Sequence, residues 1–338
     1  MTAGPTIPSD RGETILDVSG LSLAFGRRSA AVTILHNVSF WLARGEAVGM
    51  VGESGSGKSV TAAALLGLLG RTARILDGTA IFDGRDLLRL GQRELQAVRG
   101  GRIGIVFQDP LNSLNPVVRV GAQIIEMLHA HRSHDSSRHE ERVNELLRLV
   151  GIGDPARVRD AYPHQLSGGM RQRAMIAMAI ACEPALLIAD EPTTALDVTI
   201  QAQILEHFKE LRTRLGMALL LITHDLGIVA GTTSRVIVMY AGHIVETGPT
   251  AEVLATPLHP YTEGLKRSIP RLDRPRAERL EPIEGSPPDP SRPLPGCPFK
   301  PRCPKRIDRC DTAPRLSPAG PAREVACWVV SESAAGAR

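Results

Sequence analysis

The stretch GESGSGKS, residues Gly52–Ser59, decides how the first half of the chain is interpreted. It fits the pattern G-x-x-x-x-G-K-[ST], and it lies between the apolar stretch EAVGMVG and the helix-forming stretch SVTAAALLGLLG. A strand before such a loop and a helix after it are the context in which this pattern binds phosphate. Backbone N–H groups and the helix N-terminus then surround a β-phosphate. We therefore predict a nucleotide site at this phosphate loop, against the alternative of a flexible Gly/Ser turn.

Two residues of the phosphate loop have specific expected roles. Lys58 is expected to reach the β- and γ-phosphates, and Ser59 to ligate Mg²⁺. The stretch ALLIADEP supplies two carboxylates at the end of an apolar strand. We expect Asp190 to lie beside the metal and Glu191 to polarise a water that attacks the γ-phosphate. The alternative is an acidic pair that caps the following turn.

Two further polar residues follow apolar strands. Gln108 comes after RIGIVF and His224 after MALLLIT. In an open α/β sheet the carboxyl ends of the strands lie on the ligand-binding edge. We expect His224 to contact the γ-phosphate and Gln108 to contact the metal or the water. Either residue alone would be interpreted as a satisfied polar side chain.

A second glycine-rich turn, LSGGMRQR, occupies Leu166–Arg173. Like the first, it feeds a helix, a usual arrangement for binding phosphate. The alternative is that Ser167 caps a helix running through RAMIAMAIA. The two interpretations are compatible.

The remaining pattern alternates strands with helices, which predicts an α/β fold with a parallel sheet. Ala241-Gly242 is expected at the turn of a hairpin, and Gly151 is expected to stop a helix. The expected strands are 15–25, 32–43, 46–52, 102–109, 185–192 and 217–225, the hairpin is 235–248, and the expected helices are 59–70, 121–131 and 138–151.

In this order, the motifs resemble the ATP-binding subunit of ABC transporters over roughly residues 14–258, and LSGGMRQR is their most specific element. The resemblance implies a parallel-sheet core, an antiparallel β subdomain and a helical subdomain at about 109–180. It also implies two such domains packed head to tail, each ATP lying between the phosphate loop of one and the LSGG turn of the other. The stretch DPLNSLNP, residues 109–116, is then the contact with the membrane subunit.

The resemblance also assigns roles residue by residue. Phe25 would stack on adenine, and Asp197, in TALD, would lie in a loop that crosses the dimer interface. A strand-core position is the alternative for Phe25. Hydrolysis is assigned to Glu191, His224 and Gln108, and Mg²⁺ to Ser59, Gln108 and Asp190. The expected nucleotide contacts are Phe25, Gly52, Glu53, Ser54, Gly55, Ser56, Gly57, Lys58, Ser59, Val60, Gln108, Ser167, Gly168, Gly169, Asp190 and Asp197.

The composition changes near residue 258, because 15 of the 25 prolines and four of the five cysteines lie in residues 259–338. We therefore predict one domain over 1–258 and a small loop-rich extension over 259–338. Since the region is poor in apolar residues, core packing does not explain its cysteines. Four thiolates suit zinc or an iron–sulfur cluster, and a cytosolic chain is not expected to rely on disulfides. The spacing is Cys297-x5-Cys303-x6-Cys310-x16-Cys327, without a CxxC pair, and leaves both metals open.

The tail resembles the C-terminal extension of oligopeptide/dipeptide importer ATPases, and that resemblance implies a [4Fe–4S] cluster, with Zn²⁺ as the alternative. Cys182 follows an apolar helix and is expected to be a small buried hydrophobe.

Composition excludes some classes of function. A net charge of +4 and an aromatic content of 3% argue against nucleic acid as a partner. No apolar run approaches the ~18–20 residues that span a bilayer, and no apolar signal segment opens the sequence. We expect a peripheral protein at the cytoplasmic face of the membrane. Its expected partners are a second ATPase subunit, identical or a paralogue, two permease subunits and, indirectly, an extracytoplasmic solute-binding protein.

The predicted function is ATP hydrolysis that powers uptake of di- and oligopeptides. Import of nickel or another small solute is the main alternative, since the solute is chosen outside this chain. DNA-repair relatives carry long coiled coils between the two glycine motifs, whereas 108 residues separate Lys58 from Ser167 here. Translation-associated relatives carry two cassettes in one chain. A non-enzymatic scaffold would lack Lys58 or Glu191, and both are present.

Overall fold

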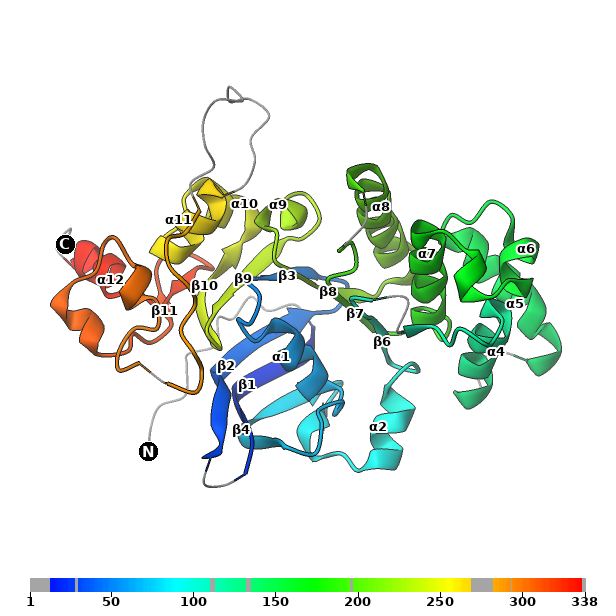
Figure 1. Ribbon diagram of the computed structural model, residues 1–338, viewed down its shortest axis with the longest axis horizontal. Helices are drawn as coiled ribbons and strands as arrows, with labels where there is room; N and C mark the ends of the chain where they lie inside the picture. Colours follow the sequence, from blue (N-terminus) through cyan, green and yellow to red (C-terminus); the bar gives the residue numbers. More distant parts are fainter. Residues whose placement is uncertain are drawn as a thin grey trace.

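The computed structural model describes residues 13–27, 30–109, 113–131, 135–194, 197–268, 282–292 and 294–335. Parts of two predicted segments, residues 110–112 of DPLNSLNP and 195–196 of TALD, lie outside these ranges. Figure 1 shows the sheets in the middle, a helical part on one side and the C-terminal segment (residues 282–292 and 294–335) on the other.

The strands are β1 (Thr14–Phe25), β2 (Val32–Ala43), β3 (Ala47–Val51), β4 (Ala73–Phe82), β5 (Arg85–Asp86), β6 (Ile103–Val106), β7 (Leu186–Asp190), β8 (Ala218–Thr223), β9 (Arg235–Tyr240), β10 (His243–Pro249), β11 (Ser317–Pro318) and β12 (Glu324–Val325). The helices are α1 (Lys58–Leu65), α2 (Gln92–Val98), α4 (Val120–Ala130), α5 (His139–Leu149), α6 (Pro155–Asp160), α7 (Gly168–Ala179), α8 (Val198–Leu215), α9 (Leu226–Val229), α10 (Thr250–Ala255), α11 (Pro260–Arg267) and α12 (Trp328–Ala335).

Two sheets form the centre of the molecule. The larger has the order β11-β12-β10-β9-β3-β8-β7-β6, and its run from β9 to β6 is parallel, which confirms the predicted parallel sheet. Residues of β3 and β8 are buried throughout, as expected for strands covered on both faces. The smaller sheet, β2-β1-β4-β5, is antiparallel. One apolar cluster joins both sheets to α1 through Leu16, Leu42, Met50 and Leu65.

The helical part contains α4, α5, α6 and α7 (Figure 1). Its core continues into the sheet, because Ile124, Leu146 and Met175 share one buried cluster with Leu187 and Leu219. The helices expected at 121–131 and 138–151 are α4 and α5. The chain leaves α5 with Gly151 at φ 79°, which confirms the predicted stop. Among helices in the described ranges, none has the length and hydropathy needed to cross a membrane.

The helix expected at 59–70 is shorter than predicted. It ends at Leu65, and Gly67 adopts φ 58° in the turn that follows. A left-handed glycine just beyond a helix is the usual way to end it. Cys182 is only half-buried, although it packs on the helical cluster as expected.

The hairpin turn at Ala241-Gly242 is confirmed. Both residues have positive φ, at 45° and 78°, which suits the tight turn between β9 and β10. A side chain at position 242 would meet the carbonyl oxygen of Ile34 at 2.0 Å, so only glycine fits. The Gly242 N–H donates to the carbonyl of Ser56 at 2.9 Å. The turn therefore supports the phosphate loop directly.

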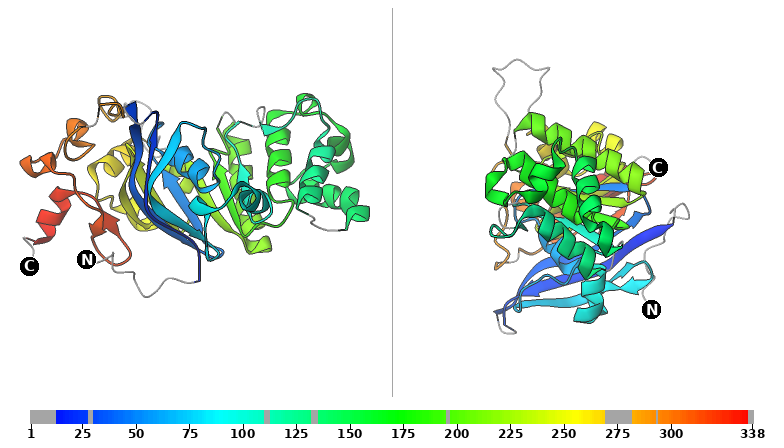
Figure 2. Two further views of the ribbon diagram at one scale, coloured as in Figure 1. Left: turned by 90° about the horizontal axis from the view of Figure 1, so that it is seen from below. Right: turned by 90° about the vertical axis from the view of Figure 1, so that its right-hand side faces the viewer.

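The C-terminal segment extends the larger sheet and does not form a separate core. Strand β12 pairs with β10, and Figure 2 shows the C-terminal segment, in orange and red, beside the rest of the molecule. Phe299, Cys297 and Cys310 share one buried cluster with Tyr240 and Tyr261. For Cys297 and Cys310, the expectation that core packing cannot explain the tail cysteines is therefore wrong. The segment has few apolar residues of its own, but it packs on the apolar face of the hairpin. The boundary near residue 258 stays a prediction.

Candidate nucleotide and hydrolysis site

The phosphate loop lies between β3 and α1, in the context that the sequence predicted. Gly57 precedes α1 with φ 103°, and a side chain there would meet Leu35 at 2.7 Å. The Lys58 ammonium is buried inside the loop and donates to the carbonyl oxygens of Gly52 at 2.7 Å and Glu53 at 3.0 Å. Burial lowers the pKa of Lys58, and the charges of Glu191, Asp190 and Glu53 act against that shift. The lysine therefore lies within electrostatic reach of the predicted catalytic carboxylates.

Ser59 and Asp190 come together across the start of α1 and the end of β7. The Ser59 hydroxyl donates to Asp190 Oδ1 at 2.9 Å. Burial raises the pKa of Asp190, and the hydrogen bond from Ser59 opposes this. A hydroxyl beside a carboxylate offers the oxygen ligands that Mg²⁺ takes. The two residues therefore fit the metal role that the motifs assign to them.

Glu191 is held apart from Asp190 by its own set of donors. Its Oε2 atom accepts from Gln108 Nε2 at 3.0 Å and from Thr194 Oγ1 at 3.0 Å, and it lies 3.3 Å from His224 Nδ1. The backbone is left-handed, with φ 46°, and the Glu191 N–H donates to Ile222 at 2.9 Å. Non-glycine residues in this region are strained and concentrate at functional sites.

The structure thus brings Gln108, Glu191 and His224 into one constellation, from the ends of β6, β7 and β8. Thr194 was not predicted, although a hydroxyl three residues after the glutamate in EPTT was a signal available in the sequence. Gln108 and Thr194 donate to the Glu191 carboxylate, and the His224 imidazole lies beside it. Such an arrangement can orient a base toward a water.

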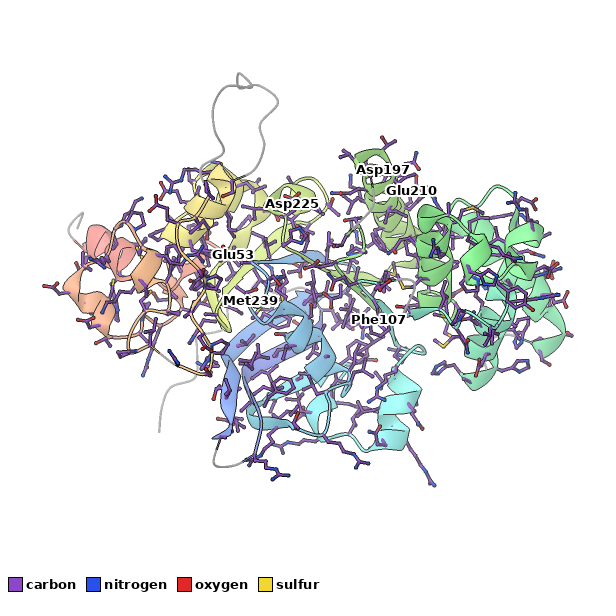
Figure 3. The ribbon with its side chains drawn as sticks, in the orientation of Figure 1. Glu53, Phe107, Asp197, Glu210, Asp225 and Met239 are labelled. Atoms are coloured by element: carbon purple, nitrogen blue, oxygen red, sulfur yellow. The ribbon has the colours of Figure 1, made fainter. Side chains whose placement is uncertain are left out.

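The LSGG turn begins α7 in the helical part, away from α1 (Figure 1). Ser167 caps this helix, because its Oγ accepts from the Met170 N–H at 3.3 Å. Gly168 and Gly169 follow it; Gly168 is exposed and Gly169 is half-buried. Asp197 caps α8 in the same way, accepting from the Ile200 N–H at 3.0 Å, and Figure 3 labels it at that helix. The capping interpretation of Ser167 is confirmed. Ser167 is also exposed, so a ligand can reach it.

Phe25 ends β1 and pairs with Val32 and Ala73 in the antiparallel sheet. It packs partly on the central cluster, as does Val60 of α1. A cavity opens on another flank of the phosphate loop, and Phe25 does not line it. Its lining residues come from the loop (Glu53, Ser54, Gly55, Ser56), from β2 (Thr33, Ile34, His36), from the hairpin (Tyr240, Ala241, His243) and from the C-terminal segment (Pro287, Pro288, Asp289, Pro290, Leu294, Gly296, Pro298).

The four tail cysteines are free thiols near one another. Cys297, Cys310 and Cys327 are buried and Cys303 is half-buried. Burial raises the pKa of Cys297 to about 11, and the other three cysteines act in the same direction. In the part of the chain that the structure describes, no group of three or more histidine, cysteine or acidic side chains is placed to hold a metal ion. The arrangement of the four cysteines therefore does not support the predicted metal centre.

Sequence comparisons agree with the motifs. The family described as ABC transporter matches residues 35–194, and the oligopeptide/dipeptide transporter C-terminal region matches residues 245–310. The dipeptide transport ATP-binding protein DppD of Bacillus subtilis is 48% identical over 95% of this chain and 96% of its own. The oligopeptide transport ATP-binding protein OppD of Salmonella typhimurium is 48% identical over 93% of both chains.

Solved structures agree on the fold. The ATP-binding cassette MJ0796, as a dimer bound to ADP and Pi, is 26% identical with a TM-score of 0.62 over 70% of this chain and 98% of its own. CbiO1 from Clostridium perfringens is 29% identical with the same TM-score of 0.62, over 72% of this chain and 91% of its own. The chain belongs to the ATP-binding proteins of ABC transporters, in the oligopeptide/dipeptide group, and is an ABC ATPase.

Proposed function

We propose that the chain is the ATP-hydrolysing subunit of an ABC importer that carries di- and oligopeptides. The observation that supports hydrolysis is the position of Glu191, whose carboxylate meets Gln108, Thr194 and His224 at one oxygen. The peptide substrate is supported by relatives named for dipeptide and oligopeptide transport, at 48% identity. Nickel or another small solute remains the alternative, because the solute contacts other subunits.

In the proposed mechanism the phosphate loop binds the triphosphate. Lys58 turns from its loop carbonyls to the β- and γ-phosphates. Ser59 and Asp190 would hold Mg²⁺, which would offset phosphate charge. Glu191 takes a proton from the attacking water while Gln108 and Thr194 hold its carboxylate and His224 faces the γ-phosphate. Phe25 stacks on adenine.

The proposed active form contains two ATPase subunits. The turn Ser167–Gly169 of one subunit, exposed at Ser167 and Gly168, contacts the γ-phosphate bound by the other subunit through N–H groups at the start of α7. Asp197 lies at the same interface. ATP then links the subunits, and loss of the γ-phosphate weakens the link and lets them open. The second subunit is an identical copy or a paralogue.

Two permease subunits complete the proposed assembly, with a solute-binding protein on the far side of the membrane. The helical part at about 109–180 is the proposed contact with the permeases. Phe107, just before this part and labelled in Figure 3, and Val117, within it, are exposed apolar side chains, which supports a partner surface there. The chain then lies at the cytoplasmic face of the membrane as a peripheral subunit.

Transport in proteoliposomes tests this function. The assembled transporter should hydrolyse ATP faster when its binding protein carries a dipeptide, and labelled dipeptide should accumulate inside the vesicles. Lys58→Ala should abolish both, since the lysine contacts the phosphates. Stimulation by nickel and not by peptides would favour the alternative substrate, and unchanged ATP affinity in Lys58→Ala would refute the site.

We further propose that Cys297, Cys303, Cys310 and Cys327 hold a [4Fe–4S] cluster, with Zn²⁺ as the alternative. Three of the four thiols are buried and the fourth is half-buried, which fits a site shielded from solvent, and thiolates are the ligands of both metals. Anaerobic purification should give a brown protein with iron and inorganic sulfide. Stoichiometric zinc without colour would favour zinc, and four titratable thiols without metal would refute the proposal.

A further inference from the structure

One side chain of the C-terminal segment reaches into the phosphate loop. Arg302 closes a short 3₁₀ turn, Lys300–Arg302, and forms a bidentate ion pair with Glu53, at 2.6 Å from Nη1 to Oε2 and 3.0 Å from Nη2 to Oε1. The Arg302 side chain is 4% exposed and that of Glu53 is 27% exposed. Figure 3 labels Glu53 on the side of the core that faces this segment. Nothing in the motif GESGSGKS requires such a partner 249 residues away.

The remaining donors of Arg302 are also used. Nε donates to the carbonyl of Glu284 at 2.9 Å, and Nη2 donates to that of Ile283 at 3.1 Å. The guanidinium also lies over the rings of Tyr240 and Phe299. A guanidinium with partners for its donors on several sides is well ordered, and a lysine would not make the same contacts.

A second contact fixes the backbone of the same loop residue. The Glu53 N–H donates to the hydroxyl of Tyr261, in α11, at 2.7 Å. Tyr261 is fully buried and packs on Tyr240 and Phe299. The carbonyl of Glu53 in turn accepts from Lys58 at 3.0 Å. The position of Glu53 therefore affects the position of Lys58, the residue expected to contact the phosphates.

Charge gives the ion pair a second effect. Glu53 places a carboxylate in a loop that binds a polyanion, and like charges at short range repel. Arg302 neutralises that carboxylate and turns it away toward the C-terminal segment. Without the arginine, the carboxylate would be uncompensated beside the triphosphate.

We infer that Arg302 and Tyr261 are positioning residues for the ATPase reaction: they hold Glu53, and with it the phosphate loop, in the form that binds ATP. The C-terminal segment thereby sets the ATP affinity of the chain. This inference rests on the proposed binding of ATP at Gly52–Ser59.

The test measures the ATP dissociation constant, KM and kcat of the full chain. Arg302→Met keeps the apolar stem and removes the charge, and it should raise the dissociation constant and KM by roughly tenfold with kcat changed less than about twofold. Adding Glu53→Gln to that variant should recover most of the loss, because the uncompensated charge is gone. A purely structural arginine would not be rescued in this way.

The chain offers a matched control in the pair Arg235 and Glu46. It is also bidentate, at 3.0 and 3.1 Å, also partly buried, and Arg235 lies over the Trp41 ring at 4.0 Å. Glu46 precedes β3, whereas the phosphate loop follows it, so the control pair lies at the other end of that strand. Arg235→Met should lower the thermal midpoint and leave the KM for ATP unchanged. An equal rise of KM in both variants would overturn the inference.

Tyr261→Phe decides the matter if Arg302→Met does not fold. It removes one hydroxyl and keeps the ring, so it should raise the KM for ATP several-fold, roughly the effect of one lost hydrogen bond. An unchanged KM in Tyr261→Phe and Arg302→Lys would refute the inference.

Lys58→Ala, measured alongside, separates the two proposals. Normal ATP binding in Lys58→Ala would mean that the nucleotide site itself is wrong. Loss of binding in Lys58→Ala, with unchanged KM in the Arg302 and Tyr261 variants, would refute only the positioning role.

Discussion

At the scale of single residues, the proposed chemistry depends on Glu191 as the base that takes a proton from the attacking water. Glu191→Gln keeps the shape and an acceptor oxygen but removes the base, so ATP turnover should fall by about 10²–10⁴-fold while ATP still binds. Steady-state hydrolysis and the nucleotide retained after gel filtration measure the two effects. Turnover at the normal rate would show that another group activates the water.

Most of this constellation follows from local motifs. Ser59, Asp190 and Glu191 each lie next to a strand or glycine signal, so the sequence singled them out as candidates, but it did not predict the contact of Glu191 with Thr194. Contacts made by residues outside these motifs were not predictable in this way. Arg302 reaches Glu53 across 249 residues, and an arginine in a proline-rich tail carries no mark of such a partner.

Helix α11 provides a prediction at the scale of one element. His259 caps it, because its Nδ1 accepts from the Tyr261 N–H at 3.0 Å. Burial lowers the pKa of His259 to about 3, against 6.5 in an unfolded chain. Between about pH 3 and pH 6.5, His259 is protonated in the unfolded chain but neutral in the folded protein. The folded protein therefore loses stability as the pH falls below 6.5. Between pH 7 and pH 5 the loss is about 2 kcal/mol.

The variant His259→Asn keeps a capping acceptor that does not titrate. Its free energy of unfolding should fall less between pH 7 and pH 5 than that of the parent, by about 2 kcal/mol, although it starts lower. Urea unfolding at both values measures this. His243, whose pKa burial lowers to about 4, contributes to both proteins equally. Parallel losses in the two proteins would contradict the assignment.

Elements differed in how well the sequence predicted them. The hairpin was predictable because Ala241-Gly242 marks a tight turn between apolar runs. The end of α1 was not, since LLGLLG continues an apolar pattern and only the left-handed Gly67 shows the stop. Strands β11 and β12 have two residues each, so they carry no periodicity to detect; β11 pairs with β12, and β12 pairs with β10.

At the scale of the whole molecule, the C-terminal segment shares a buried core with the rest of the chain. Phe299 is 1% exposed and packs on Tyr240 and Tyr261, which belong to preceding elements. Phe299→Ala should therefore destabilise the whole chain by about 3–5 kcal/mol. Leu76→Ala, at a side chain that is 50% exposed, should change stability by less than about 0.5 kcal/mol.

Denaturant unfolding followed by tyrosine and tryptophan fluorescence measures both variants. A separate early transition for the tail of Phe299→Ala, with the main transition unmoved, would mean that the segment folds independently. Composition predicted a boundary near residue 258, yet it does not reveal that residues around Phe299 pack on apolar side chains of β9, β10 and α11, the last of which lies beyond that boundary.

The central claim is that ATP is held between two ATPase subunits and hydrolysed there. Its most direct test is a structure of the assembled transporter carrying Glu191→Gln, with ATP and Mg²⁺. The account predicts that the Ser167–Gly169 turn of this chain lies within hydrogen-bonding distance of the γ-phosphate bound by the opposite subunit. A triphosphate enclosed by a single chain, with that turn facing no nucleotide, would contradict it.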